Sequence, residues 1–239
     1  KEYGSLLNVR DDQYDALSGY LEELKREGAS NLLLQGWLNT ISERMPALIK
    51  QAKIMSMKFD AVVTNPPYMG GKGQSSTISD FLKDNYPDTK SDTFSAFIER
   101  CGDMSNRNGF VGMFTPYVWM FIQSYEKLRN MLYSRKDILT LIQFEYSAFE
   151  EATVPVCTFA FRNLKTGMTG EYLRLVDFRG GMEVQRVKTL EAIADPKCGY
   201  RYTANSDNFE KIPGCPVAYW VRNYAIFDFE KLGAGYQSG

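Results

Sequence analysis

The sequence contains no histidine, and this absence excludes several classes of catalysis. Neither a Ser-His-Asp nor a Cys-His relay can form, and no metal can be bound through imidazole. The four cysteines include no C-x-x-C pair, which disfavours structural zinc and a redox dithiol. The sequence also lacks a signal peptide and any apolar run near the roughly 18 residues of a membrane helix. We therefore expect no metal, no membrane partner and a cytoplasmic location with reduced thiols.

An excess of positive charge is missing too. The 28 Lys and Arg residues face 29 Asp and Glu residues, which leaves a formal net charge of −1. The usual electrostatic footprint of a nucleic-acid-binding protein is therefore absent. A nucleic-acid contact would have to come from a local patch or from segments outside this chain. The 239 residues can bury a full core as one large domain or two small ones.

Hydrophobic periodicity predicts an α/β chain that begins with helices. Leucines at helical spacing predict a helix over residues 11–27, and a second helical region follows over 31–57. Four strands and two helices are expected after them: strands at 61–63, 109–115, 138–146 and 156–161, and helices at 92–106 and 121–134. The gap between the last two strands is too short for a crossover helix, so we expect them to be antiparallel neighbours. The order predicts a mainly parallel sheet that ends in an antiparallel hairpin.

The character of the sequence changes after Gly167. Residues 170–178 and 182–187 are typical of a β-hairpin across Gly180-Gly181, and weak helical character returns at 225–232. We therefore predict three regions: a helical segment (1–57) that packs on the sheet, a catalytic-type α/β region (58–165), and a small β-containing extension (166–239).

The most informative segment is Phe59–Tyr68, in which an apolar strand ends in Asn65-Pro66-Pro67-Tyr68. In an open parallel sheet, ligands lie beyond the carboxyl ends of the strands. The two prolines hold the backbone extended and stiff at this point. Asn and Pro are also common in plain turns, but the strand directly before the tetrad favours a functional interpretation.

The tetrad suits a planar heterocycle that carries an amino group. The Asn65 side-chain oxygen and the Pro66 carbonyl can both accept hydrogen bonds from an exocyclic amine. Two such acceptors would draw the amine lone pair out of conjugation and make it nucleophilic without a histidine base. Tyr68 can stack on the ring, a contact that contributes about 1–3 kcal/mol.

The tetrad resembles the catalytic motif of S-adenosylmethionine-dependent N6-adenine DNA methyltransferases, especially the large enzymes of bacterial phage-exclusion and type II restriction-modification systems. The similarity extends through the strand at 109–116 and the segment 148–162, and weakly to 213–220, which resembles the approach to a target-recognition region. It implies catalytic roles for Asn65, Pro66, Pro67 and Tyr68. It also implies a base flipped out of double-stranded DNA and held between Tyr68 and Phe149. Ser91 or Asp92 is expected to cap the helix that follows the tetrad.

This resemblance covers only the C-terminal part of the family's catalytic domain. The glycine-rich cofactor motif is absent from the chain, so its cofactor-binding residues are unknown. We expect the second half of a Rossmann-like class I methyltransferase sheet, inactive alone and binding S-adenosylmethionine weakly or not at all. The bare edge of the strand before Asn65 predicts a partner: the missing N-terminal half, a second copy through a dimer or domain swap, or a helix from residues 11–57. Two alternatives stay open, a protein-glutamine or RNA-adenine methyltransferase fragment and a non-catalytic DNA-recognition or assembly subunit.

Overall fold

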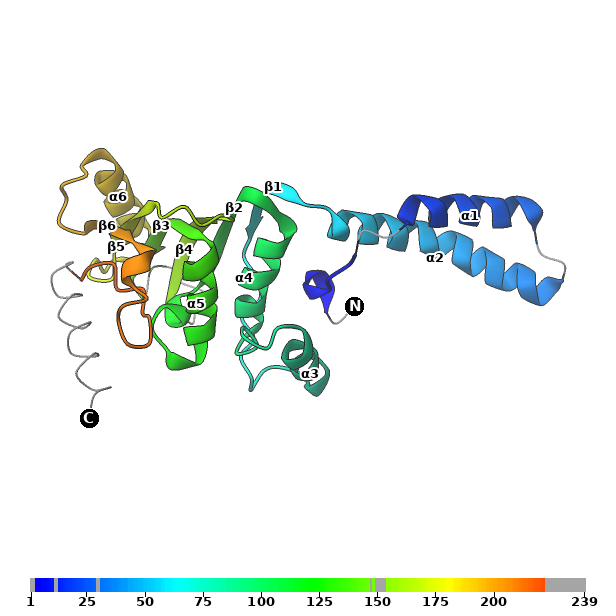
Figure 1. Cartoon of the computed structure of the whole chain (residues 1–239), viewed down its shortest axis with the longest axis horizontal. Coiled ribbons are helices and arrows are strands. Elements are labelled where there is room, and N and C mark those ends of the chain that lie inside the picture. The colour runs from blue at the N-terminus through cyan, green and yellow to red at the C-terminus, as the bar shows by residue number, and fades with distance from the viewer. Residues whose placement is uncertain (1–2, 11–12, 29–30, 147, 149–153, 222–239) are drawn as a thin grey trace. The chain divides into compact units, whose positions relative to one another are not determined.

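A computed structural model describes residues 3–10, 13–28, 31–146, 148 and 154–221. The chain divides into two units, Lys1–Lys58 and Phe59–Gly239. Figure 1 labels their helices and strands. Each unit is described by itself.

The first unit is a helical hairpin. Its helices are α1 (Tyr14–Glu27) and α2 (Leu32–Ser56), and they contact each other. Gly28 ends α1 with a φ of 70°, which glycine adopts without strain. Asn31 begins α2 by accepting a hydrogen bond from the Leu34 amide at 2.9 Å. Helix α2 continues through Pro46 as one element, so no new helix begins there.

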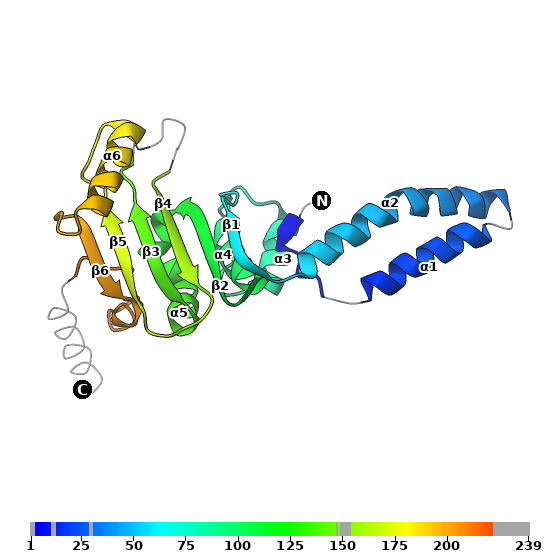
Figure 2. The same ribbon diagram turned by 90° about the horizontal axis from the view of Figure 1, so that it is seen from above.

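The second unit contains a six-stranded sheet. Its strands are β1 (Phe59–Thr64), β2 (Ser105–Pro116), β3 (Asp137–Gln143), β4 (Val156–Arg162), β5 (Thr169–Arg174) and β6 (Arg201–Asn205). Its helices are α3 (Ser76–Asn85), α4 (Thr93–Met104), α5 (Glu126–Arg135) and α6 (Gly181–Ala194). The strand order is β1-β2-β4-β3-β5-β6, which Figure 2 shows from above.

The strand pairing confirms one prediction and corrects another. Strands β3 and β4 are antiparallel neighbours, as their short connection predicts. The sheet is mixed rather than mainly parallel, because only the β1–β2 and β3–β5 pairs among the described strands are parallel. Strand β4 lies between β2 and β3, and β5 and β6 extend the sheet beyond them. Among the described strands, β1 is an edge strand that pairs only with β2.

One local prediction was wrong. The expected hairpin across Gly180-Gly181 does not form, because residues 181–194 are helix α6 and β5 pairs instead with β3 and β6. The glycine- and serine-rich loop after Tyr68 is short and leads into α3, which Ser75 caps by accepting from the Ile78 amide at 3.2 Å. The helix expected at 225–232 lies outside the described residues.

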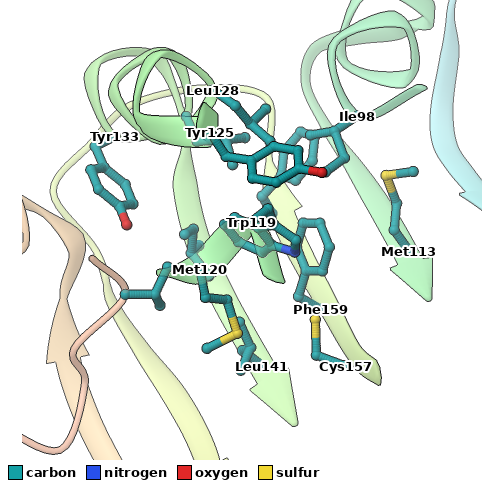
Figure 3. Close-up of a cluster of buried hydrophobic side chains, with 14 of the residues drawn as sticks. Ile98, Met113, Trp119, Met120, Tyr125, Leu128, Tyr133, Leu141, Cys157 and Phe159 are labelled. Atoms are coloured by element: carbon teal, nitrogen blue, oxygen red, sulfur yellow. The ribbon is translucent and has the colours of Figure 1, made fainter. Parts of the chain in front are cut away.

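The main core lies between one face of the sheet and helices α4 and α5. Alternate residues of β2, such as Val111 and Met113, point into it, and Trp119 lies beside Phe159 with ring centroids 4.9 Å apart (Figure 3). The side chains of Phe110 and Phe114 therefore point to the opposite face, where Gly112 presents only its backbone. Helix α6 covers the β5 end of that face, where Leu173 and Ala192 belong to a second buried cluster.

Candidate functional site

The Asn-Pro-Pro-Tyr tetrad begins where β1 ends. Thr64, the last residue of β1, pairs with Met113 of β2, and Asn65 follows it. Pro66 is buried, whereas the Asn65 side chain is exposed. The buried proline fixes the backbone at the sheet edge, so the Asn65 amide is presented to solvent at the carboxyl end of a parallel strand.

The Tyr68 side chain folds back over Asn65. Its hydroxyl donates to the Asn65 Oδ1 at 2.8 Å and lies 3.3 Å from the Phe114 carbonyl oxygen. The edge of the Tyr68 ring meets Phe94 of α4, with centroids 6.3 Å apart and planes at 89°. Tyr68 remains 36% exposed. The predicted acceptor and the predicted stacking ring are therefore neighbours, and they bind each other in this structure.

The electrostatics keep the Tyr68 hydroxyl protonated. Burial, and to a smaller extent the neighbouring Cys157, raise the pKa of Tyr68 to about 12. The hydroxyl is thus a hydrogen-bond donor at neutral pH. Asn65 does not titrate, so the pair carries no charge.

The backbone after the tetrad is tied to the start of α4. Asp92 is the N-cap of α4, as predicted, and its carboxylate also accepts from the Met69 amide at 2.8 Å. The Thr93 hydroxyl donates to the Pro67 carbonyl oxygen at 2.7 Å. Burial raises the pKa of Asp92, opposed by the hydrogen bonds from Met69 and Phe94. Sequence reasoning missed these two ties, because only the capping role of Asp92 leaves a local pattern.

An open apolar trough of about 710 Å³ runs from the tetrad across the sheet face opposite the main core. Val63, Gly112 and Ala160 contribute to its floor, and Ala192 and Ile193 of α6 contribute to one wall. Val63 is 81% exposed and Ile193 is 64% exposed. Buried faces of parallel strands normally have a cover. The described residues leave this face bare next to Asn65.

Other predicted features lie elsewhere or have no counterpart among the described residues. Phe149, the expected second wall for a base, lies outside them. Within the described ranges, no group of three or more His, Cys, Asp or Glu side chains could hold a metal ion. The four cysteines are free. No helix in the described part of the chain is long and apolar enough to cross a membrane.

The sheet resembles that of solved methyltransferases. It matches the methyltransferase subunit of a type I restriction-modification system from Streptococcus thermophilus with a TM-score of 0.52 at 15% identity, over 68% of this chain and 38% of that subunit. At this identity the likeness shows the fold alone. The fold class is thus an α/β methyltransferase fold, which the chain contains in part.

The sequence gives the family. The chain belongs to the Eco57I restriction-modification methylase family, whose model matches residues 4–149. It is 35% identical over 234 residues to the adenine-specific methyltransferase BrxX of Escherichia coli O9:H4 (strain HS), covering 98% of this chain and 19% of that protein. It is 34% identical over 226 residues to the adenine-specific methyltransferase PglX of Lacticaseibacillus casei (strain Zhang), covering 92% and 19%. The chain therefore spans about a fifth of the length of these curated relatives.

Proposed function

We propose that this chain supplies the base-binding side of a DNA methyltransferase that modifies the N6 amino group of adenine in a restriction-modification or defence system. The observation that carries the proposal is the side-chain amide oxygen of Asn65, which is exposed at the carboxyl end of β1 beside the partly exposed Tyr68. The relatives BrxX and PglX are described as adenine-specific methyltransferases, which supports adenine as the substrate.

The proposed chemistry needs only hydrogen-bond acceptors and an aromatic face from this chain. The Asn65 Oδ1 and the Pro66 carbonyl would each accept one N–H of the amine, which turns the nitrogen lone pair away from the ring and raises its nucleophilicity. Tyr68 would stack on the base after it leaves the duplex, and this contact offsets part of the unstacking cost. Phe149 is proposed as the second face.

We infer that the described residues do not build a complete site for the methyl donor. The outer edge of β1 is unpaired among them, and the sheet face that carries Val63 is bare. No glycine-rich strand-to-helix turn precedes Asn65 in the sequence. We therefore propose that S-adenosylmethionine, which supplies an electrophilic methyl group, is held by another part of the parent protein and weakly or not at all by this chain.

The sheet topology indicates where that other part would attach. The crossover from β1 to β2 uses α3 and α4, and α4 packs on the core face. Crossover connections between parallel strands are right-handed. Helices that cover the opposite face of the sheet therefore belong to connections that run in the opposite direction across it, between strands added beyond β1. The carboxyl end of β1 would then lie at a topological switch point, where such sheets bind ligands. A further segment of the parent polypeptide thus fits the trough and the free β1 edge better than a second copy.

Two measurements test this proposal. The parent protein, incubated with labelled S-adenosylmethionine and separately with DNA, RNA or protein acceptors, should form N6-methyladenine in DNA. Label found only in RNA or in glutamine side chains would reject DNA adenine as the substrate, and no transfer at all would favour a recognition subunit. Titration calorimetry should show no S-adenosylmethionine binding by this chain at concentrations of about 100 μM, roughly the range of ordinary enzyme substrates. Micromolar binding would place the cofactor site within this chain.

A further inference from the structure

Residues at the start of α4 form hydrogen bonds with the backbone on both sides of Tyr68. On one side, the Thr93 hydroxyl donates to the Pro67 carbonyl oxygen at 2.7 Å. On the other side, the Asp92 Oδ1 accepts from the Met69 amide at 2.8 Å, and the Thr93 amide donates to the Met69 carbonyl oxygen at 3.3 Å. Asp92 and Thr93 are 8% and 4% exposed, so these bonds are partly shielded from competing water.

These hydrogen bonds are held in place because the same groups also cap the N-terminus of α4. The Asp92 Oδ1 that binds Met69 also accepts from the Phe94 amide at 3.2 Å. The Ser95 hydroxyl accepts from the Asp92 amide at 3.1 Å and completes a capping box. Helix α4 is in turn anchored in the main core through Phe94 and Ile98. The position of the tetrad therefore follows the position of a buried helix.

The two ends of the tetrad are held by different means. Toward Asn65, the consecutive prolines restrict the backbone covalently. Toward Met69, no proline is present, and the restraint comes from the three hydrogen bonds with Asp92 and Thr93, together with one that the Gln74 side chain donates to the Met69 carbonyl oxygen at 2.8 Å. These restraints act on the backbone and leave the Tyr68 side chain free of any hydrogen bond to Asp92 or Thr93.

We propose that Asp92 and Thr93 are positioning residues for the transfer reaction. They hold the Pro67–Met69 backbone, and so fix the Asn65 and Pro66 oxygens while the Tyr68 ring moves. This inference rests on the proposed function and deepens it. Neither side chain touches the base in this scheme, and both act through the backbone of the tetrad.

The chain offers a matched control in Ser91. Its hydroxyl donates to the Ser124 carbonyl oxygen at 3.0 Å, in the 3-10 helix Gln123–Tyr125 and not in the tetrad. Ser91→Ala and Thr93→Val each delete one hydroxyl and one hydrogen bond to a backbone carbonyl at the start of the same helix. They differ in whether that carbonyl belongs to the tetrad. Thr93 is also more buried, and its hydroxyl lies 3.3 Å from the Asp92 Oδ1, which the Thr93→Ser variant controls for.

Steady-state kinetics of the full-length parent protein form the first arm of the test. Because a small misplacement of reacting groups can cost about 100-fold in rate, Thr93→Val should lower kcat about 10- to 100-fold and change KM for DNA by less than about twofold. Thr93→Ser keeps the hydroxyl and should restore kcat to within about threefold of the wild type, and Ser91→Ala should stay within about twofold. A Thr93→Val variant no slower than Ser91→Ala would overturn the proposal.

Amide hydrogen exchange in this chain, followed by NMR, forms the second arm and requires no activity. Asp92→Ala should speed exchange of the Met69 amide about tenfold or more, while the amides of β2 keep their protection and report an intact core. Asp92→Asn retains an acceptor oxygen and should preserve protection of Met69. An unchanged exchange rate of the Met69 amide in Asp92→Ala would overturn the proposed restraint of the tetrad backbone by Asp92. A parent protein that makes no N6-methyladenine but shows this exchange pattern would instead reject the proposed function.

Discussion

Replacing Tyr68 by phenylalanine removes the hydroxyl that binds the Asn65 oxygen and keeps the ring. In the proposed reaction, the Asn65 Oδ1 must accept a hydrogen bond from the adenine amine, yet the Tyr68 hydroxyl holds that oxygen at 2.8 Å. The Asn65 Oδ1 has two lone pairs, and the Tyr68 hydroxyl already engages one of them. In our proposal the adenine amine takes the place of this hydroxyl, so the two hydrogen bonds compete and the Tyr68–Asn65 bond stabilises the closed site.

The size of the effect follows from the strength of one hydrogen bond. A typical intramolecular hydrogen bond contributes about 0.5–1.5 kcal/mol, which corresponds to about a 2- to 12-fold change in an equilibrium. Since Tyr68 is 36% exposed, water can replace the lost bond, and the lower part of this range applies. Tyr68→Phe in the parent protein should therefore lower KM for DNA about two- to fivefold, with kcat unchanged or raised.

Tyr68→Ala provides the comparison, because it removes both the hydroxyl and the ring. Loss of a stacking contact of about 1–3 kcal/mol should reduce kcat/KM about 5- to 150-fold. Steady-state methyl-transfer kinetics with labelled S-adenosylmethionine measure both variants. If Tyr68→Phe is as impaired as Tyr68→Ala, the hydroxyl contributes to catalysis and the competition described here is wrong.

Three predictions concern stability and can be checked on this chain by urea unfolding. Burial alone would raise the pKa of the Asp137 carboxyl, but hydrogen bonds from residues 166–168 outweigh it and hold this pKa below its ordinary value. The ionised Asp137 carboxylate therefore stabilises the fold fully above the unfolded pKa of about 3.9, and this stabilisation is lost as pH falls through the lower folded pKa. Asp137→Asn should lower the free energy of unfolding by about 2–3 kcal/mol at pH 7. The variant should also lose less stability than the wild type below a pH of about 4. The fully buried Arg129 donates hydrogen bonds to the carbonyl oxygens of residues 119, 122 and 214. Arg129→Met leaves these oxygens unpaired and should lower the free energy of unfolding by about 3–5 kcal/mol. A loss below about 1 kcal/mol would contradict this. A Cβ at Gly170 would lie 2.2 Å from the Ile138 carbonyl oxygen, so Gly170→Ala should cost about 3 kcal/mol, whereas Gly112→Ala, whose Cβ would meet only a side chain at 3.7 Å, should cost less than about 1 kcal/mol.

Local signals explain which parts of the fold were predictable. The Asn-Pro-Pro-Tyr tetrad follows an apolar strand, and the Asp92 cap precedes a periodic helix, so both could be placed from neighbouring residues alone. The antiparallel pairing of β3 and β4 followed from the length of their connection. In each case the structure depends on residues close together in the sequence.

The failures arise where distant contacts decide the structure. The segment 182–187 contains residues that suit a strand, but 181–194 forms α6 and its Ala192 packs with Leu173 of β5. Strand β5 pairs with β3 and with β6, which lie about 30 residues before and after it in the chain, and no turn signal marks either pairing. The ties from Asp92 and Thr93 to the tetrad likewise join residues 23 and 26 positions apart.

The acceptor role of Asn65 is the central claim, and Asn65→Ala in the full-length parent protein tests it most directly. The variant keeps the prolines, the Tyr68 ring and the hydrogen bonds to α4, and loses the side-chain acceptor together with its hydrogen bond from the Tyr68 hydroxyl. Loss of one preorganised hydrogen-bonding group at a reacting centre typically costs about 100- to 1,000-fold in kcat. We predict a loss of that size in the rate of N6-methyladenine formation, with KM for DNA little changed. A variant that methylates adenine at the wild-type rate would contradict the account.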